Sequence, residues 1–150
     1  MTLPAYRAAL GPKREAALAL DKALGKMPLD FFVMTSSISA VLGNPGQANY
    51  AAGNSFLDHL ALARRRRGLA ACSLALPLVE DVGVVAENEA LAAALARKMP
   101  FGVDEREMLR GFEAAIRHGA AAPSSSSTPE PTLGDAQLVL GLEPVAMRDA

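Results

Sequence analysis

The amino-acid sequence predicts an α/β fold that forms part of a doubly wound parallel sheet. Two apolar runs, at residues 31–35 and 71–76, are short and continuous, as in strands that a parallel sheet buries on both faces. Alanine- and leucine-rich segments of helical length flank both runs. The resulting order of helix, strand, helix, strand, helix, helix and strand requires crossover helices. Because three strands make a poor independent sheet, we expect the C-terminal half of a doubly wound domain, with further strands outside this chain.

The first predicted helix covers about residues 3–24, where alanine and leucine recur at helical spacing. Gly11-Pro12 interrupts this pattern, and we expect a split or a kink there because proline cannot donate a helical hydrogen bond. Gly25 is the expected C-cap. After the strand at 31–35, residues 36–46 are predicted to form a loop, since two glycines, an asparagine and a proline stand together near its end.

The second predicted helix covers residues 48–66. Its apolar stripe consists of Phe56, Leu57 and Leu60, and Gly68 should end it. The second strand, at 71–76, stops at a proline, and residues 79–86 are predicted to form a loop.

The last third of the chain contains two more predicted helices, at 87–98 and 104–117, the second with Asp104 as its N-cap. A last strand is expected at 137–140. Between them, residues 120–132 hold four successive serines and three prolines, which indicates a flexible linker or a surface insertion. The predicted organisation is a unit over residues 1–119, a linker or insertion over 120–133, and a final strand with a C-terminal tail over 134–150.

Composition excludes several classes of function. The net charge of −1 gives no basis for attracting nucleic acid, and the four arginines at 64–67 are interpreted as a solvated helix end. The lone Cys72 excludes an internal disulfide, fits a reducing cytosol and is expected in the core. No apolar run approaches the roughly 18 residues that span a bilayer, so we expect a soluble cytoplasmic protein. The two histidines have no ligand-like spacing with Cys72, so no metal site is expected.

Four polar residues are candidates for chemistry. Ser37 follows the first predicted strand, and doubly wound sheets bind ligands beyond the carboxyl ends of their strands. Tyr50 and Asn54 are four apart and share one helix face. A phenol with a pKa near ~10 needs a nearby cation to act at neutral pH, and Lys13 on the preceding helix is the candidate. Taken singly, the serine would be a turn or cap and the tyrosine a packing residue; together the four suit proton transfer during reduction of a ketone.

The residues around this set resemble the ketoreductase domains of type I polyketide synthases, especially fungal highly reducing ones. The resemblance rests on Ser36-Ser37-Ile38-Ser39, on residues 43–54 and on Phe56-Leu57-Asp58. Residues 78–88 and 134–137 also resemble the corresponding segments of these domains. These domains are relatives of short-chain dehydrogenases and have a Rossmann-like fold. Most free-standing relatives have lysine four positions after the tyrosine, where this chain has Asn54. Polyketide synthase ketoreductases have that lysine upstream instead, where Lys13 stands, 37 − 13 = 24 positions before Ser37.

The resemblance implies a role for each residue. Tyr50 would give the proton to the β-keto oxygen, Ser37 would hydrogen-bond that oxygen, Lys13 would favour the tyrosinate, and Asn54 would hold the water of a proton relay. NADPH would supply the hydride, with Pro77, Leu78 and Val79 near its nicotinamide. The helices at 87–98 and 104–117 would form part of a lid. The substrate would be a β-ketoacyl chain on an acyl carrier protein, and the product a β-hydroxyacyl chain.

The sequence leaves two alternatives open. The chain could be an inactive piece that packs against a missing N-terminal half, which would carry the glycine-rich nucleotide loop. It could instead be a stand-alone dehydrogenase, a reading that Asn54 weakens. Departures from the family pattern include Pro77 in place of a common glycine and Thr35 in place of an apolar residue. We expect the isolated chain to be marginally stable and to expose an apolar sheet edge.

Overall fold

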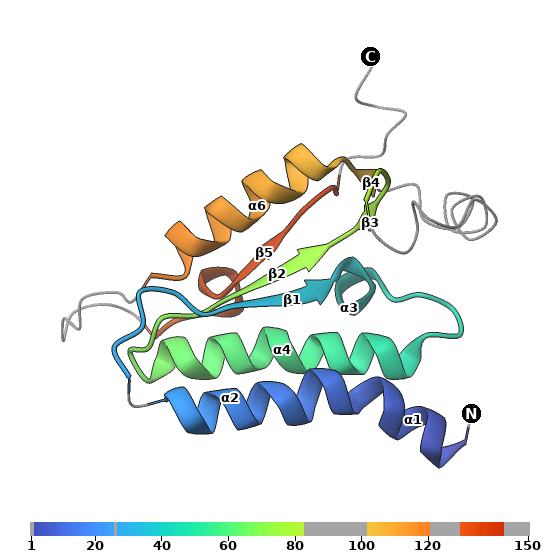
Figure 1. Cartoon of the computed structure of the whole chain (residues 1–150), viewed down its shortest axis with the longest axis horizontal. Helices are drawn as coiled ribbons and strands as arrows, with labels where there is room; N and C mark the ends of the chain where they lie inside the picture. The colour runs from blue at the N-terminus through green and yellow to red at the C-terminus, as the bar shows by residue number, and fades with distance from the viewer. Residues whose placement is uncertain (1, 26, 83–101, 121–129, 143–150) are drawn as a thin grey trace.

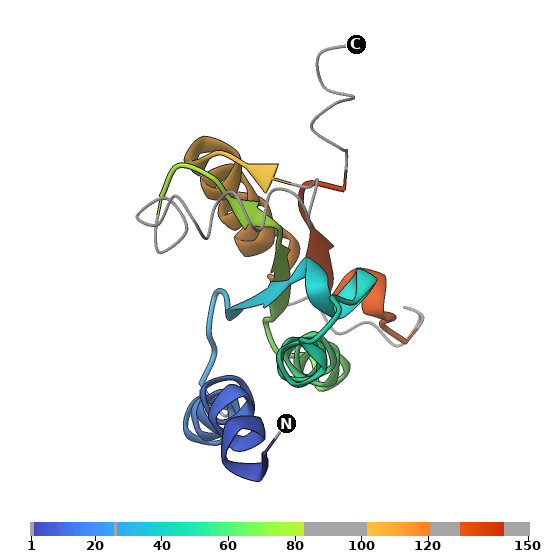
Figure 2. The same cartoon turned by 90° about the vertical axis from the view of Figure 1, so that its right-hand side faces the viewer.

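A computed structural model of the chain describes residues 2–25, 27–82, 102–120 and 130–142. Within them, helices cover both faces of a parallel sheet (Figures 1 and 2), which confirms the predicted fold class. The strand order is β1-β2-β5. The three strands are β1 (Val33–Ser37), β2 (Cys72–Leu76) and β5 (Gln137–Val139). A short parallel pair, β3 (Leu78–Val79) with β4 (Gly102–Val103), continues from the end of β2.

The first predicted helix is a single rod with an internal π-helical segment. It consists of α1 (Leu3–Leu10), η1 (Gly11–Glu15) and α2 (Ala16–Leu24). The expected irregularity at Gly11-Pro12 is confirmed, and it takes the form of a wider turn instead of a break. Because proline lacks an N–H, the regular hydrogen-bond ladder cannot pass through it unchanged. The π-helical segment contains Lys13, and such segments often occur at functional sites.

The region around β1 corrects the sequence prediction at two points. The strand lies two residues later than predicted and includes Ser36 and Ser37, and α3 (Ile38–Leu42) replaces the first part of the predicted loop. Ser37 caps α3, because its Oγ accepts the Ser39 N–H at 3.2 Å. A five-residue helix is too short for periodicity to reveal. The expectation that β1 is buried on both faces was also wrong, since Thr35 in the middle of the strand is exposed.

Helix α4 (Ala48–Arg66) has the predicted bounds and packs under the sheet. Leu57 and Leu60 are buried in a cluster with Ala17 of α2 and Met34 of β1, as the apolar stripe predicted. Gly68 follows the helix with φ +74°, a conformation that favours glycine and ends the helix. This layer therefore forms from α2, α4 and β1 together.

Helix α6 (Glu105–His118) covers the opposite face of the sheet (Figure 1). Asp104 is its N-cap, as predicted, and forms a capping box with Glu107. Its buried side packs on the cluster of β2 that contains Cys72, so α6 is a layer of the fold, which corrects its expected role as part of a lid. Cys72 is fully buried, and burial raises the pKa of its thiol to about 11, consistent with a core residue. The predicted helix at 87–98 lies outside the described residues.

The C-terminal end of α4 is more buried than the sequence predicted. Arg64 is completely buried: its guanidinium pairs with Asp21 of α2 at 2.6 Å and lies 4.1 Å from the centre of the Phe32 ring. Arg67 bonds the same Asp21 oxygen at 2.7 Å. The interpretation of this arginine run as a solvated helix end was therefore wrong for Arg64. Its planar charge stacks on an aromatic ring and joins α4 to α2.

Candidate active site

Ser37 lies at the carboxyl end of β1, next to the middle of α4. Ser37 is 7% exposed, and its side-chain oxygen already accepts the Ser39 N–H. The neighbouring Ser36 donates its hydroxyl to the Asn54 carbonyl of α4 at 3.2 Å. This bond holds the end of β1 against the helix turn that carries Tyr50 and Asn54. The structure thus brings three of the predicted residues to one end of the sheet.

Asn54 is fully buried, and one of its two polar atoms has an identified partner. Its Nδ2 donates to the Tyr50 carbonyl at 2.9 Å, one turn earlier on α4. Its Oδ1 is buried and has no hydrogen-bond partner among the described residues. An unpaired buried acceptor costs about 1–3 kcal/mol, which favours an added donor at this position. A water molecule would meet that need.

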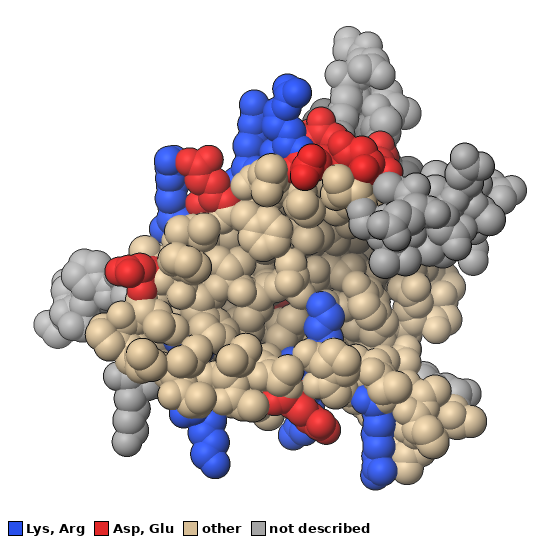
Figure 3. All heavy atoms as spheres, in the orientation of Figure 1, with Lys and Arg blue, Asp and Glu red and all other residues tan. Residues whose placement is uncertain are grey.

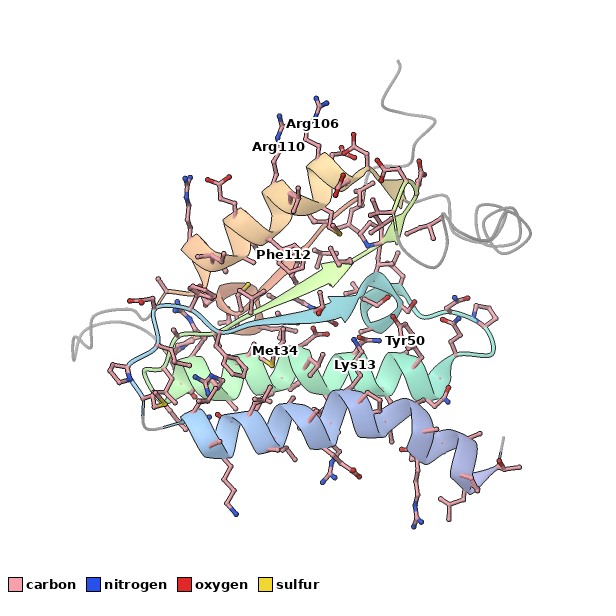
Figure 4. All side chains as sticks on the ribbon, in the orientation of Figure 1. Lys13, Met34, Tyr50, Arg106, Arg110 and Phe112 are labelled. Atoms are coloured by element: carbon pink, nitrogen blue, oxygen red, sulfur yellow. The ribbon has the colours of Figure 1, made fainter. Side chains whose placement is uncertain are left out.

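Tyr50 stands in the first turn of α4, and 39% of its surface is exposed. The exposed fraction leaves its phenol accessible from outside the core. Figure 4 shows Tyr50 and Lys13 close together near the carboxyl end of β1. The chain's other tyrosine, Tyr6 of α1, is similarly exposed at 41%. The exposed fraction therefore does not distinguish Tyr50 from Tyr6; only their positions in the fold do.

Lys13 reaches the carboxyl end of β1 from the π-helical segment η1. Its ammonium donates to the Thr35 carbonyl at 2.8 Å. The aliphatic part of Lys13 crosses α4 at Gly53, where an added Cβ would lie 3.4 Å from both Lys13 Cβ and Cγ. Half-burial of Lys13 lowers the pKa of its amine below the ordinary value of 10.5. In Figure 3, one blue group stands alone in the tan face, at the place where Figure 4 labels Lys13.

The sequence correctly placed Lys13 on the helix before β1, but it did not predict the contacts that fix the position of the Lys13 side chain. Neither the π-helical turn nor the bond to the Thr35 carbonyl was predicted, because both depend on tertiary packing. Gly53 gave a visible signal: it is a glycine in the interior of a helix, where it lowers stability unless another element packs closely against it. In the structure, η1 does pack against α4 there, although an added Cβ would still fit at ordinary van der Waals distance from Lys13.

Pro77, Leu78 and Val79 follow the end of β2, next to the carboxyl end of β1 in the sheet. The proline is buried, and a Cβ added at Gly141 would lie 2.8 Å from its Cγ. Leu78 and Val79 are half-buried and form β3, which corrects the prediction of a loop beginning at residue 79. The three residues lie at the sheet edge where α/β folds bind ligands.

Two negative findings apply to the part of the chain that the structure describes. No group of three or more histidine, cysteine or acidic side chains is placed to hold a metal ion. No helix there is both long and apolar enough to cross a membrane.

Comparison with known proteins gives consistent matches. Residues 1–81 match the family described as "KR domain". The reducing polyketide synthase DEP5 of Fusarium langsethiae is 41% identical over all 150 residues, and the squalestatin tetraketide synthase of a Phoma species is 37% identical over 142 residues. This chain spans only 6% and 5% of the lengths of those two relatives.

Solved structures agree with the sequence matches. A structure titled "Structure of A1-type ketoreductase" has a TM-score of 0.74 and 32% identity, covering 81% of this chain and 25% of that one. A ketoreductase from the first module of phoslactomycin biosynthesis in Streptomyces has a TM-score of 0.69 and 34% identity, covering 83% of this chain and 28% of that one. The chain therefore belongs to the KR domain family and is part of a ketoreductase domain of the polyketide synthase type.

Proposed function

We propose that this chain carries the proton-transfer residues of a ketoreductase that reduces a carrier-bound β-ketoacyl thioester to the β-hydroxyacyl form with NADPH. One observation supports the proposal: Lys13 of η1 bonds the Thr35 carbonyl near the end of β1 where Ser37 stands, and Ser36 ties that end of β1 to the turn of α4 that holds Tyr50 and Asn54. Substrate and carrier protein are inferred from the relatives, which are polyketide synthases many times longer than this chain.

The hydrogen bonds of the site support a distinct role for Ser37. Its oxygen already accepts from the Ser39 N–H, so its own hydroxyl proton is free to point outward. A ketone oxygen at the end of β1 would accept that proton in a hydrogen bond and become polarised. The Tyr50 phenol would donate a second hydrogen bond and then transfer its proton as negative charge develops on the ketone oxygen.

Lys13 and Asn54 would support Tyr50 in two ways. The positive charge of Lys13 near the phenol stabilises the tyrosinate that remains after proton transfer. The unpaired Asn54 Oδ1 would accept a hydrogen bond from a water, which returns a proton toward the phenol. Lys13 bonds the Thr35 carbonyl in this structure, so its contribution to Tyr50 is electrostatic.

Apolar residues follow β2 at the end of the sheet, where the proposal puts the nicotinamide ring. Leu78 and Val79 follow Leu76, which is aligned with Ser37, and they offer half-buried apolar surface against which a flat ring would pack. NADPH supplies the hydride when bound. The proposed organisation, with an insertion over residues 120–133 inside one ketoreductase unit, is supported by the pairing of β5 with β2 across that segment.

The experiment uses the complete ketoreductase domain that contains this chain, purified with Tyr50→Phe. Loss of the phenolic proton donor should lower the rate of ketone reduction by about 10²–10⁴-fold, while NADPH binding, measured by fluorescence titration, stays near wild type. Tyr6→Phe is the matched control and should leave both unchanged, because Tyr6 is similarly exposed but lies on α1. Turnover retained by the Tyr50 variant would rule out its role as proton donor.

A further inference from the structure

The segment that follows β2 is fixed at its start by close packing. Pro77, the first residue after β2, is buried. A Cβ added at Gly141 would lie 2.8 Å from the Pro77 Cγ and 3.2 Å from the Val103 Cγ1. Gly141 lies just beyond β5 with φ +63°, a conformation that favours glycine. The proline ring therefore packs against backbone that leaves no room for a side chain.

The far end of the same segment is fixed by hydrogen bonds to the residues that begin α6. The Glu80 N–H donates to the Val103 carbonyl of β4 at 3.1 Å. The next residue, Asp81, accepts the Glu105 N–H on its Oδ1 at 2.8 Å. Glu105 is the first residue of α6, where an N–H has no acceptor within the helix. Figure 1 shows β3 and β4 side by side at this end of α6.

Helix α6 does not need Asp81 in order to begin. The Asp104 Oδ1 accepts the Glu107 N–H at 2.7 Å, and the Glu107 Oε2 accepts the Asp104 N–H at 3.1 Å. This capping box is complete without Asp81. Asp81 stands 24 residues before Glu105 in the sequence. The main consequence of its bond is thus to hold the segment after β2 against the helix.

Helix α6 is a firm support for this bond, because the core sets its position. Ala115 is 0% exposed and packs in the cluster of β2 that contains Leu74. Gly111 is buried, and a Cβ added there would overlap the Leu140 side chain. The backbone of α6 thus lies close to the end of β5. A bond to the Glu105 N–H therefore fixes Asp81 relative to the core.

We propose that Asp81 is a positioning residue for the cofactor, because its bond to Glu105 holds Leu78 and Val79 where the nicotinamide ring packs. These two residues lie between the two fixed points, Pro77 and Asp81. The inference rests on the proposed function, which puts the ring against them. Asp81 acts through Leu78 and Val79 and does not touch the ring. Without its bond, NADPH would have to order the segment when it binds, and its affinity would fall.

The size of the effect is limited by the bond that is lost. Asp81 is exposed, so water competes for its carboxylate. The net contribution of one hydrogen bond corresponds to about a three- to tenfold change in an equilibrium constant. Pre-organisation by Asp81 can strengthen NADPH binding by no more than this factor. The fold itself should change little, since α6 keeps its own cap.

The kinetic test uses the complete ketoreductase domain that contains this chain. Asp81→Ala should raise the KM for NADPH about three- to tenfold and leave kcat at saturating NADPH within about twofold, because bound cofactor then orders the segment. Asp81→Asn keeps the Oδ1 acceptor and should restore most of the affinity. Asp135→Ala is the matched control: this exposed carboxylate accepts the Thr132 N–H at 2.9 Å, but it lies in η2 (Leu133–Asp135) before β5. Its KM for NADPH should not change.

The same bond can be removed from its donor side. Glu105→Pro deletes the N–H, and proline is favourable at the first position of a helix. The preceding Asp104 is extended, with ψ 171°, as the residue before a proline prefers. This variant should raise the KM for NADPH as Asp81→Ala does, and the double variant should be no worse than either. Glu105→Ala keeps the N–H and is its control. An unchanged KM in Glu105→Pro, or additive effects in the double variant, would overturn the proposal.

Amide hydrogen exchange tests the support of the segment without NADPH or a ketone. In the 150-residue chain, Asp81→Ala should speed exchange of the Glu80 N–H about three- to tenfold, because its bond to Val103 opens more often. The Leu140 N–H, which donates to the Ala75 carbonyl at 3.0 Å, is the internal reference and should not change. Unchanged exchange at Glu80, or equal acceleration at both amides, would overturn the positioning by Asp81.

The two readouts separate this inference from the proposed function. Faster exchange at Glu80 with an unchanged KM for NADPH would refute the role of Asp81 in cofactor binding, while ketone reduction by the wild-type domain would still support the proposed function. A wild-type domain that does not bind NADPH would refute the proposed function and the cofactor role together. The exchange rates would then still decide whether Asp81 fixes the segment after β2.

Discussion

Replacing Asp21 with alanine should strongly destabilise the chain, because it leaves the buried Arg64 guanidinium without its counter-charge. The Arg64 side chain is 0% exposed and that of Asp21 is 13% exposed. After the substitution, the guanidinium would keep the Ala70 carbonyl, which accepts from its Nε at 3.2 Å, and the face of Phe32. Its Nη2 is already buried without a partner among the described residues. The lost charge therefore has no replacement within the described core.

The magnitude follows from the burial of the pair. Removing one partner of a buried ion pair costs about 3–5 kcal/mol. Alanine recovers about 0.6 kcal/mol of helix propensity at this position, and water reaches the partly exposed Asp21 side. We therefore expect a loss of about 3 kcal/mol in the free energy of unfolding. At about 2–4 °C per kcal/mol for a chain of this size, the melting temperature should fall by about 6–12 °C.

The assay is urea denaturation of the 150-residue chain, with Glu113→Ala as the control. Glu113 pairs with Arg117 at 2.6 Å, the same separation, but the two side chains are 61% and 78% exposed. That substitution should cost less than about 1 kcal/mol, since water screens an exposed pair. Equal losses in the two variants would refute the argument that burial, and not distance, sets the energy.

A pH series checks the same pair independently. Burial raises the pKa of Asp21, but hydrogen bonds and positive charge from Arg67 and Arg64 outweigh this, so the pKa lies below its ordinary value of 3.8. The stability that the carboxylate contributes is thus present above pH 3.8 and is lost as pH falls through the folded-state pKa. The difference between wild type and Asp21→Ala should narrow in that acid range.

Three other predictions concern the site and its support. Lys13→Arg should move the alkaline limb of the pH–rate profile of the complete domain to higher pH, because burial lowers the pKa of the lysine and arginine stays protonated. Ser73→Ala should cost about 1–3 kcal/mol in urea denaturation, because the buried Asp58 carboxylate loses its 2.5 Å donor. Gly119→Ala should cost about 1–3 kcal/mol, because its Cβ would lie 2.8 Å from that of Cys72.

Each of these predictions has an outcome that contradicts it. An alkaline limb that does not move with Lys13→Arg would mean that another group sets it. Gly134→Ala is the control for the glycine variant, since the atom nearest an added Cβ there is 3.8 Å away. A loss below about 0.5 kcal/mol for Ser73→Ala, or equal losses for the two glycine variants, would show that the packing relaxes.

The sequence predicted the elements whose pattern is long or whose ends are marked. Helix α4 was predicted to the residue, because its apolar stripe is regular and Gly68 follows it. Helix α6 was predicted within one residue, since the cap at Asp104 is a local signal. Helix α3 and strand β3 were missed because five and two residues are too few to show a period. The exposure of Thr35 was missed because burial of a strand depends on its neighbours in the sheet.

The candidate site could be predicted in its residues but not in its contacts. Ser37, Tyr50 and Asn54 lie within 18 residues of sequence and share one strand–helix unit, so their approach was predictable from local spacing. Lys13 comes from another helix, and it reaches the Thr35 carbonyl from the π-helical turn, with its aliphatic part lying against α4 at Gly53. Neither can be derived without the packing of α4 against η1.

The burial of α4 offers a reason why the lysine of the candidate site stands at position 13 and not at position 54. Position 54 is 0% exposed, and an asparagine there uses its amide to bond the Tyr50 carbonyl. A lysine at that position in this chain would place an ammonium in a fully buried site, where desolvation would cost several kcal/mol or deprotonate it. Lys13 is only half-buried, and the Thr35 carbonyl and solvent compensate its charge. If Lys13 serves Tyr50 as proposed, a half-buried cation from a second helix does so, and its position depends on the contact between η1 and α4. An alanine Cβ at Gly53 would make ordinary 3.4 Å contacts with Lys13, so we expect only larger side chains there to displace Lys13 and, under the proposed function, to lower the rate of ketone reduction.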